Sequence, residues 1–173
     1  NFMSITIPDG VTKIKEGTFG YCTSLKNVTL PNSITSIGVG AFSVCSALTS
    51  ITLPKGLATI EDYAFSYAGL TEVNLPNSIT SIGVGAFSVC SALNHIKLPD
   101  NLTEVKDYAF QGANLETIDW PVSLTSVGTS AFENQKDYTI DPPSIIVSIN
   151  TITYHGTKAQ WDEMAGPQNF ATT

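Results

Sequence analysis

The chain has 173 residues, which suits one domain with a sizeable buried core, and a formal net charge of −7. Its eight basic residues are all lysines. A nucleic-acid-binding protein needs a basic stripe for the phosphates and usually arginine for the bases, so the composition argues against that class. The sequence also contains no run of about 18 apolar residues, the minimum that a membrane-spanning helix requires.

The sequence repeats itself. The nineteen residues from Leu30 to Leu48 return unchanged from Leu75 to Leu93, 45 residues later. Around these copies a looser unit places prolines at intervals of 23, 23, 22, 23 and 22 residues, at Pro8, Pro31, Pro54, Pro76, Pro99 and Pro121. A period of this length is typical of a solenoid. We therefore assign residues 1–132 to an array of 22- and 23-residue units with a 45-residue super-repeat, and residues 133–173 to the cap and tail of the same domain.

The chain opens inside a repeat. Phe2–Pro8 aligns with Leu48–Pro54, and the first residue is Asn1 rather than methionine. This alignment predicts a piece of a longer protein with further repeats upstream. Any export signal or wall anchor would then lie outside this piece.

Each unit begins with a short alternating segment, of which Leu25, Val28 and Leu30 are one example. The last three positions alternate between apolar and polar residues and are rich in β-branched residues, which predicts a short half-buried strand. The proline that follows lacks a donor N–H and fixes φ, so it ends the strand and turns the chain.

A second apolar pair follows in each unit, as at Ile34 and Ile37, and predicts another extended run on the opposite wall of the coil. An Ala-Phe pair then closes the unit. We expect the phenylalanines to stack through the interior of the array, at Phe19, Phe42, Phe65, Phe87, Phe110 and Phe132. No single turn can bury its apolar side chains alone, so the array depends on contacts between neighbouring turns.

The unit LxxIxLPxxLxxIxxxAFxxC, present over Leu25–Cys45 and with Ala68 at its last position over Leu48–Ala68, resembles the leucine-rich repeat of the Treponema pallidum type, found in BspA-like bacterial surface proteins. Six occurrences cover residues 2 to 132. The resemblance implies a leucine-rich-repeat solenoid, mainly β, with parallel strands, one per turn, and little helix. It also implies an exported bacterial protein acting in adhesion to host components or to other cells. The chain departs from the pattern at Ala68, Ala113 and Gln135, where the cysteine is missing.

Cys22, Cys45 and Cys90 each lie three residues after the phenylalanine of their unit. An odd number of cysteines cannot pair completely, and buried thiols can serve as small apolar side chains in an interior column. Cys22 and Cys45 fall on adjacent turns, where a spacing of about 4.8 Å lies within the Cα range of a disulfide. The sequence leaves open whether these two form one.

After Phe132 the period fails. Residues 133–137 and 141–143 are polar and proline-containing and predict a connection, after which Ser144–Tyr154 alternates like a strand. Thr157 and Gln160 have the spacing of a capping box and predict a short capping helix over Lys158–Ala165. We expect Trp161 on this helix to close the end of the array over Phe132 and its neighbours.

The sequence offers little for catalysis. The two histidines, His95 and His155, lie 60 residues apart and outside any zinc-binding spacing, and no nucleophile elbow, phosphate-binding loop or dinucleotide fingerprint occurs. We therefore predict neither an enzyme nor a bound metal or cofactor.

A recognition surface has more support. Residues that point outward between the apolar anchors of the first segment form two columns, neutral and rich in hydroxyls at first and charged from Glu72 onward. Adjacent turns bring these charges within reach of one another, so we predict a ligand-contact patch at Glu72, His95, Lys97, Glu116 and Asp119. The alternative interpretation is a solvated β face with compensating charges.

Tyr63 and Tyr108 precede the Ala-Phe pair of the shorter units, where the other units have glycine or serine. Each ring can lie over a small neighbour on the next turn. The pair is a secondary contact candidate, an exposed aromatic ridge, or else serves to pack the outer wall.

Two functional classes remain open. The first is a non-enzymatic module on the bacterial cell surface, or secreted, that binds a host extracellular protein, another cell or a glycan through its repeat faces. The second is a structural spacer that holds other domains of a longer surface protein away from the cell. We also expect weak self-association through unpaired strand groups at the open N-terminal edge.

Overall fold

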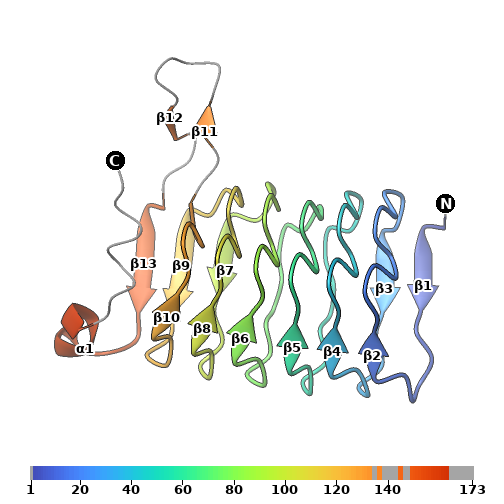
Figure 1. The fold of residues 1–173 in the computed structure, drawn as a ribbon, viewed down its shortest axis with the longest axis horizontal. Coiled ribbons are helices and arrows are strands. Elements are labelled where there is room, and N and C mark those ends of the chain that lie inside the picture. The colour runs from blue at the N-terminus through green and yellow to red at the C-terminus, as the bar shows by residue number, and fades with distance from the viewer. Residues whose placement is uncertain (1, 134–135, 138–143, 146–148, 164–173) are drawn as a thin grey trace.

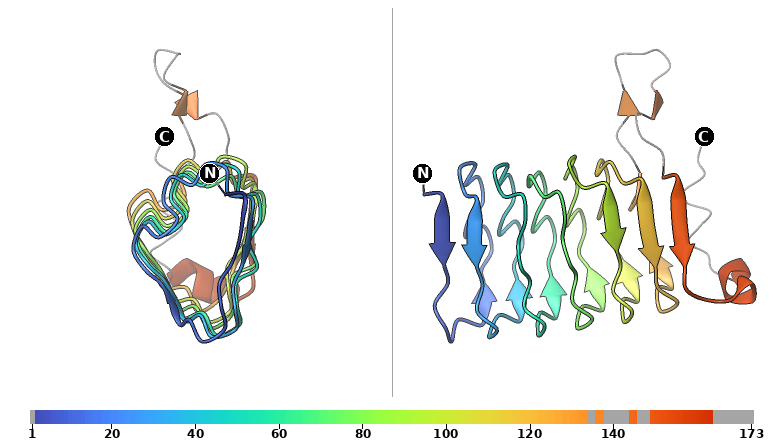
Figure 2. Two further views of the ribbon diagram at one scale, coloured as in Figure 1. Left: turned by 90° about the vertical axis from the view of Figure 1, so that its right-hand side faces the viewer. Right: turned by 180° about the vertical axis from the view of Figure 1, so that it is seen from behind.

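The computed structural model describes residues 2–133, 136–137, 144–145 and 149–163. The chain winds into a parallel β-solenoid whose turns lie side by side, with one short helix at the C-terminal end (Figure 1). Seen along the axis, successive turns superpose closely around one interior (Figure 2). The predicted solenoid is thereby confirmed.

The first segments of the units form one wall, which we call the first wall. Two parallel sheets lie on it, β1–β3 and β7–β9–β13. Between these sheets, residues 49–53 and 71–75 form no regular strand. The strands of the first wall are β1 (Ser4–Thr6), β3 (Asn27–Thr29), β7 (His95–Lys97), β9 (Thr117–Trp120) and β13 (Thr151–Tyr154).

The second segments form the opposite, second wall and pair more regularly than the first (Figure 1). Their two-residue strands make one six-stranded parallel sheet in the order β10-β8-β6-β5-β4-β2. Many turns thus contribute a strand to each wall, where the resemblance implied one strand per turn. These strands are β2 (Lys13–Ile14), β4 (Ser36–Ile37), β5 (Thr59–Ile60), β6 (Ser81–Ile82), β8 (Glu104–Val105) and β10 (Ser126–Val127).

The phenylalanine column runs through the interior as predicted. Neighbouring rings from Phe19 to Phe132 stack with centroids 5.2 to 5.3 Å apart and planes within 20° of parallel. This separation is close to the spacing of paired strands, so one ring per turn fills the coil without a gap. The column therefore ties each turn to both of its neighbours.

The chain beside the phenylalanines runs through tight turns in which several residues other than glycine have positive φ. Tyr21 has φ 61° and Val44 has φ 59°. A left-handed residue with a Cβ costs about 1–2 kcal/mol. The neighbouring turn offsets that cost, because the N–H of Tyr21 donates to the carbonyl of Ser43 at 2.8 Å and that of Val44 to the carbonyl of Ser66 at 2.8 Å.

In the shorter units, an aspartate side chain accepts a hydrogen bond from the backbone of the next unit. Asp107 Oδ1 accepts a hydrogen bond from the N–H of Thr129 at 2.7 Å, and Asp62 Oδ1 accepts one from Val84 at 2.8 Å. We expect Asp107→Ala to lower the free energy of unfolding by about 1–2 kcal/mol, because the Thr129 N–H loses a charged acceptor. Urea denaturation would measure the loss. Asp107→Asn keeps a side-chain oxygen and should lose less than half as much; equal losses would show that this hydrogen bond is not the cause.

The C-terminal part departs from the period and then rejoins the coil. β11 (Lys136–Asp137) and β12 (Ser144–Ile145) form an antiparallel pair that projects from it (Figure 1). β13 then pairs in parallel with β9, Thr151 opposite Thr117. Of the strand predicted over residues 144–154, positions 146–148 lie outside the described residues, as does the connection at 141–143.

The capping helix α1 (Lys158–Glu163) begins where predicted. Thr157 N–H donates to Gln160 Oε1 at 2.8 Å and Gln160 N–H to Thr157 Oγ1 at 3.3 Å, so the capping box is confirmed. The predicted end of the helix, residues 164–165, falls outside the described part.

Trp161 closes the end of the array through an intermediary. Its ring packs edge-on against Trp120, with centroids 6.5 Å apart, and in a tilted arrangement against Tyr154, with centroids 5.2 Å apart. The Trp120 ring in turn lies 5.6 Å from that of Phe132. The predicted plug over Phe132 and its neighbours is therefore confirmed, with the fully buried Trp120 as the neighbour that Trp161 covers.

Candidate functional site

The predicted contact patch is largely assembled on two adjacent strands. β7 and β9 pair in parallel, with Lys97 opposite Asp119 and His95 opposite Thr117. His95 Nδ1 lies 2.7 Å from Thr117 Oγ1, a hydrogen bond whose donor depends on the histidine tautomer. His95 and Lys97 are exposed and Asp119 is half-buried. A partner could therefore contact an imidazole, an ammonium and a carboxylate on one face.

The other two predicted residues lie at the margins of this patch. Glu116 is exposed directly before β9, and its carbonyl accepts hydrogen bonds from the N–H groups of Asn150 and Thr151. Glu72 is exposed on the preceding turn, on a segment without strand pairing. The structure therefore groups His95, Lys97, Glu116 and Asp119 on adjacent strands and places Glu72 beside them.

Sequence reasoning predicted a strand here but not that it lies beside β9 and continues this surface. β13 carries the two columns one step further, with Thr151 beside Thr117 and Thr153 beside Asp119. The alternation within residues 144–154 predicted a strand, but the failed period gave no register for it. Thr151 and Thr153 are exposed and add hydroxyls to the edge of the patch.

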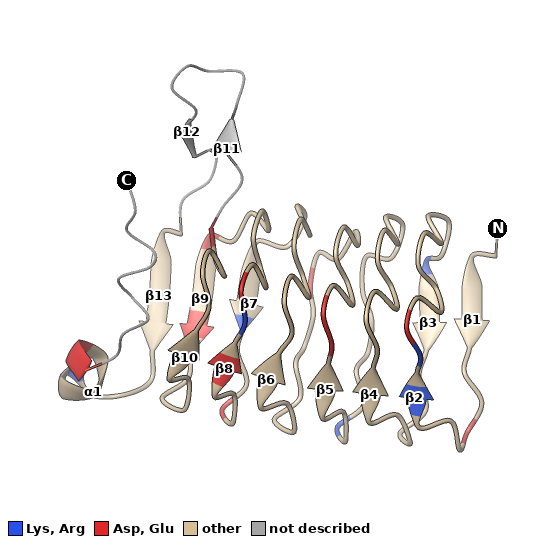
Figure 3. Ribbon diagram, in the orientation of Figure 1, with Lys and Arg blue, Asp and Glu red and all other residues tan. Residues whose placement is uncertain are grey.

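Charge is unevenly distributed over the first wall. The outward residues of β1 and β3 are serine, threonine and asparagine, as the predicted hydroxyl-rich columns require. Figure 3 shows charged residues on β7 and β9 but none on β1, β3 or β13. Among the described strands of the first wall, β7 and β9 thus carry the charged side chains, whereas near β3 the exposed Lys26 directly precedes the strand.

The exposed tyrosines lie in the tight turns beside the phenylalanine column and not on the first wall. Tyr63 and Tyr108 are 47% and 40% exposed and have positive φ. The Tyr63 ring lies over Gly85, where an added Cβ would come within 2.5 Å of Cε1, so the predicted ring-over-glycine packing holds there. Tyr21 and Tyr67, 78% and 56% exposed, extend the aromatic surface. They lie two residues after the phenylalanine of their units, in a different column from Tyr63 and Tyr108, and they were not predicted as contact residues.

The thiols are poorly suited to nucleophilic chemistry. Cys45 Sγ donates to the carbonyl of Phe19 at 3.2 Å and Cys90 Sγ to that of Phe65 at 3.1 Å. Burial raises the pKa of Cys90 to about 12, and burial together with the nearby Cys22 raises the pKa of Cys45 to about 11. These thiols stay protonated at neutral pH. All three cysteines are free, and Cys22 is half-buried rather than enclosed.

Within the described ranges, no group of three or more His, Cys, Asp or Glu side chains is arranged to hold a metal ion. Over the same residues, no helix has the length and apolar character to cross a bilayer.

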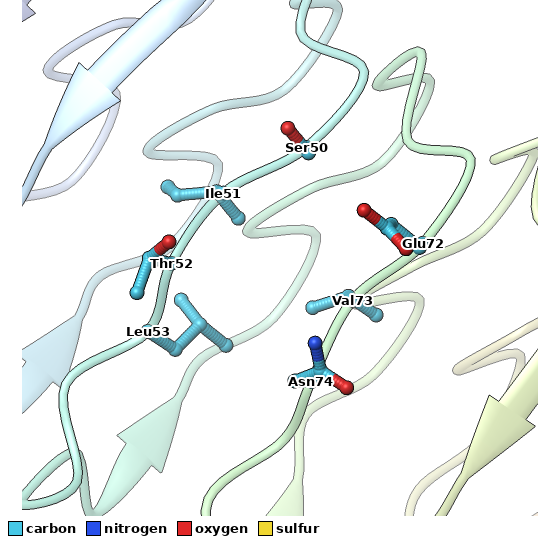
Figure 4. A pocket seen from close by; sticks show the side chains of 7 residues that line it. All are labelled: Ser50, Ile51, Thr52, Leu53, Glu72, Val73 and Asn74. Carbon is cyan, nitrogen blue, oxygen red and sulfur yellow. The ribbon is translucent and has the colours of Figure 1, made fainter.

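A small cavity opens on the first wall where strand pairing is missing. It has a volume of about 160 Å³ and lies between residues 50–53 and 72–74 of adjacent turns. Figure 4 shows its lining, with Ile51, Leu53 and Val73 between the two segments and polar side chains along their outer sides. No sequence pattern predicts this cavity, because both segments alternate like their paired neighbours.

Known proteins share this architecture. The sequence matches the BspA type leucine rich repeat region, in six copies, over residues 1–69 and 58–160. No curated protein matches it. Among solved structures, a Treponema pallidum leucine-rich repeat protein is 31% identical with a TM-score of 0.67, covering 73% of this chain and 69% of its own.

Two further structures come from other bacteria. A leucine-rich repeat protein from Bacteroides ovatus is 34% identical, with a TM-score of 0.56 over 75% of this chain and 40% of its own. A leucine rich cell surface protein from Faecalibacterium prausnitzii is 28% identical, with a TM-score of 0.50. The match covers 93% of this chain and 62% of that protein. This chain thus spans less than two thirds of each of these two proteins. The six-copy match and the shared solenoid show that the chain belongs to the BspA-type leucine-rich repeat family.

Proposed function

We propose that this chain is a non-enzymatic recognition module of a bacterial cell-surface protein, and that it binds an extracellular partner through the strand face around β7 and β9. The main support is the pairing of β7 with β9, which presents His95, Lys97 and Asp119 side by side on a rigid ladder. The rest of the first wall lacks a comparable mixture of charges. Family membership adds weight, since a similar solved structure is described as a cell surface protein.

The partner belongs to one of three classes: a host extracellular protein, another cell or a glycan. A mixed surface of one cation, two carboxylates, an imidazole and hydroxyls suits polar recognition more than apolar burial. Such groups fix orientation and specificity, and they make association sensitive to salt.

Surface plasmon resonance against matrix proteins, mucins and glycans tests the proposal. The informative variant replaces His95, Lys97, Glu116 and Asp119 with alanine and should weaken binding to a panel member at least about tenfold. A matched control replaces Asp9, Lys13 and Glu16, which are exposed near β2 and whose removal changes the net charge equally. The control should bind like the parent chain.

Equal binding by both variants would reject the β7–β9 face as the site. Absence of binding to every panel member, with circular dichroism showing a folded chain, would favour the structural spacer instead. Deleting one 45-residue pair of turns separates the two functions further, because a spacer would only become shorter, whereas a binding module would lose its partner when the deleted pair contains β7.

A further inference from the structure

The first wall has a break in its hydrogen-bond ladder from β3 to β7, because residues 49–53 and 71–75 pair as strands neither with each other nor with the flanking sheets. The last backbone bond that joins the two central turns on this wall runs from the N–H of Thr71 to the carbonyl of Thr49, at 2.9 Å. Beyond it, in the part of the chain that the structure describes, no backbone bond connects residues 50–53 with 72–75. Peptide groups at such a break keep their capacity to hydrogen-bond with another molecule.

The cavity at this break has an apolar floor. Ile51, Leu53 and Val73 point inward like the anchors of the paired strands, yet each stays 7% exposed, whereas Ile96 and Ile118 on the paired strands are fully buried. A volume of about 160 Å³ is several times the roughly 30 Å³ that one water occupies in the liquid. The cavity can therefore hold a few water molecules or one extended side chain.

The rim of the cavity carries polar groups that can accept hydrogen bonds, and one of them is negatively charged. Ser50, Thr52, Glu72 and Asn74 are exposed around it (Figure 4). Among the described residues, the Glu72 carboxylate has neither an ion pair nor a hydrogen bond. The net charge of −7 over the whole chain also favours a cationic ligand at this site.

We infer that this cavity takes one lysine side chain presented by a partner protein. Its four-carbon stem would lie against Ile51, Leu53 and Val73, and its ammonium group would donate hydrogen bonds to Glu72 and to the rim oxygens. Lysine suits such a site because it combines an apolar stem with a compact charge that has three donors. This inference rests on the proposed function, because a macromolecular partner must present the side chain.

The experiment uses a small probe in place of the partner. N-acetyl-lysine methylamide is titrated into the ¹⁵N-labelled chain and followed by NMR. The control is N-acetyl-norleucine methylamide, whose side chain has the same four carbons but no ammonium group. We expect the lysine probe to shift the amide signals of residues 50–53 and 72–74, with an affinity at least threefold higher than that of the norleucine probe. Glu72→Gln should remove that difference.

Two further variants test the location. Thr52→Trp places a large ring on the rim and should abolish the shifts. Thr29→Trp makes the same change one turn away, in β3, where Thr29 pairs with Thr6 and does not line the cavity, and should leave the shifts unchanged. Both positions are exposed, so both variants should keep the signal dispersion of the folded chain.

Equal affinity for the two probes, absence of shifts at 50–53 and 72–74, or equal effects of the two tryptophan variants would each overturn the lysine site. These outcomes are distinct from failure of the proposed function. Should the panel partner bind and Thr52→Trp leave that binding intact, the lysine site is wrong and the recognition module stands. Should the lysine probe bind while no panel partner does, the site stands and the proposed function fails.

Discussion

Phe87→Ala should lower the free energy of unfolding by about 3–5 kcal/mol, the range for truncating a buried phenylalanine. Phe87 is fully buried, and its ring stacks on both Phe65 at 5.3 Å and Phe110 at 5.2 Å. Removing it leaves a cavity in the middle of the column and weakens two interfaces between turns. Urea denaturation followed by circular dichroism would measure the loss.

Phe19→Ala provides the matched control at the N-terminal end of the column. Phe19 stacks on Phe42 at 5.2 Å, but its other neighbour is the exposed Phe2, whose ring packs edge-on at 6.3 Å. Its loss should be smaller by 1 kcal/mol or more, at about 2–3 kcal/mol, because the end of the array can relax around the gap. An equal loss at the two positions would mean that the column contributes no more at its centre than at its end.

Gly69→Ala should also be strongly destabilising, by about 1–3 kcal/mol or more. A Cβ at Gly69 would lie 2.1 Å from the backbone oxygen of Ser46 and 3.0 Å from its carbonyl carbon. The clash is with backbone, so one turn would have to move relative to the next. A fall in the thermal midpoint of several degrees is the expected observation.

Gly56→Ala is the control for the glycine substitution itself. The nearest heavy atom to a Cβ at Gly56 is the oxygen of Asn32 at 4.0 Å, and no positive φ is required there. This variant should be neutral or stabilised by up to about 1 kcal/mol, through the unfolded chain. Similar losses for Gly56→Ala and Gly69→Ala would show that close packing at Ser46 is not responsible.

Features repeated in the sequence were predictable because their structure is set within a unit and its nearest neighbours. The two identical nineteen-residue copies make the same contacts: Ser33 and Ser78 each donate to a carbonyl of the preceding turn, and Cys45 and Cys90 do likewise. The period of the sequence determines which residues share a column. It therefore predicted that His95, Lys97 and Asp119 lie close together, as the pairing of β7 with β9 shows.

Features that depend on small differences between turns were not predictable. Residues 50–53 and 72–74 alternate just as the paired strands do, so no pattern distinguishes the break in the ladder. The approach of Gly69 to Ser46 is equally specific, since the corresponding position of the next short unit holds Asn114, whose Nδ2 donates to the carbonyl of Ser91 at 2.9 Å. The place of β13 beside β9 depends on a long-range contact that follows the end of the period.

The break in the ladder between β3 and β7 also determines how the molecule would carry tension. In a solenoid the bonds between turns run along the axis, so a pull on the two ends loads the successive interfaces in series. The three interfaces between β3 and β7 transmit that load through the second wall, the tight turns beside the phenylalanines and the interior rings, without a strand ladder on the first wall. Under shear from a moving fluid, the coil would open first among the turns between β3 and β7, with the paired strands β1–β3 on one side and β7–β9–β13 on the other.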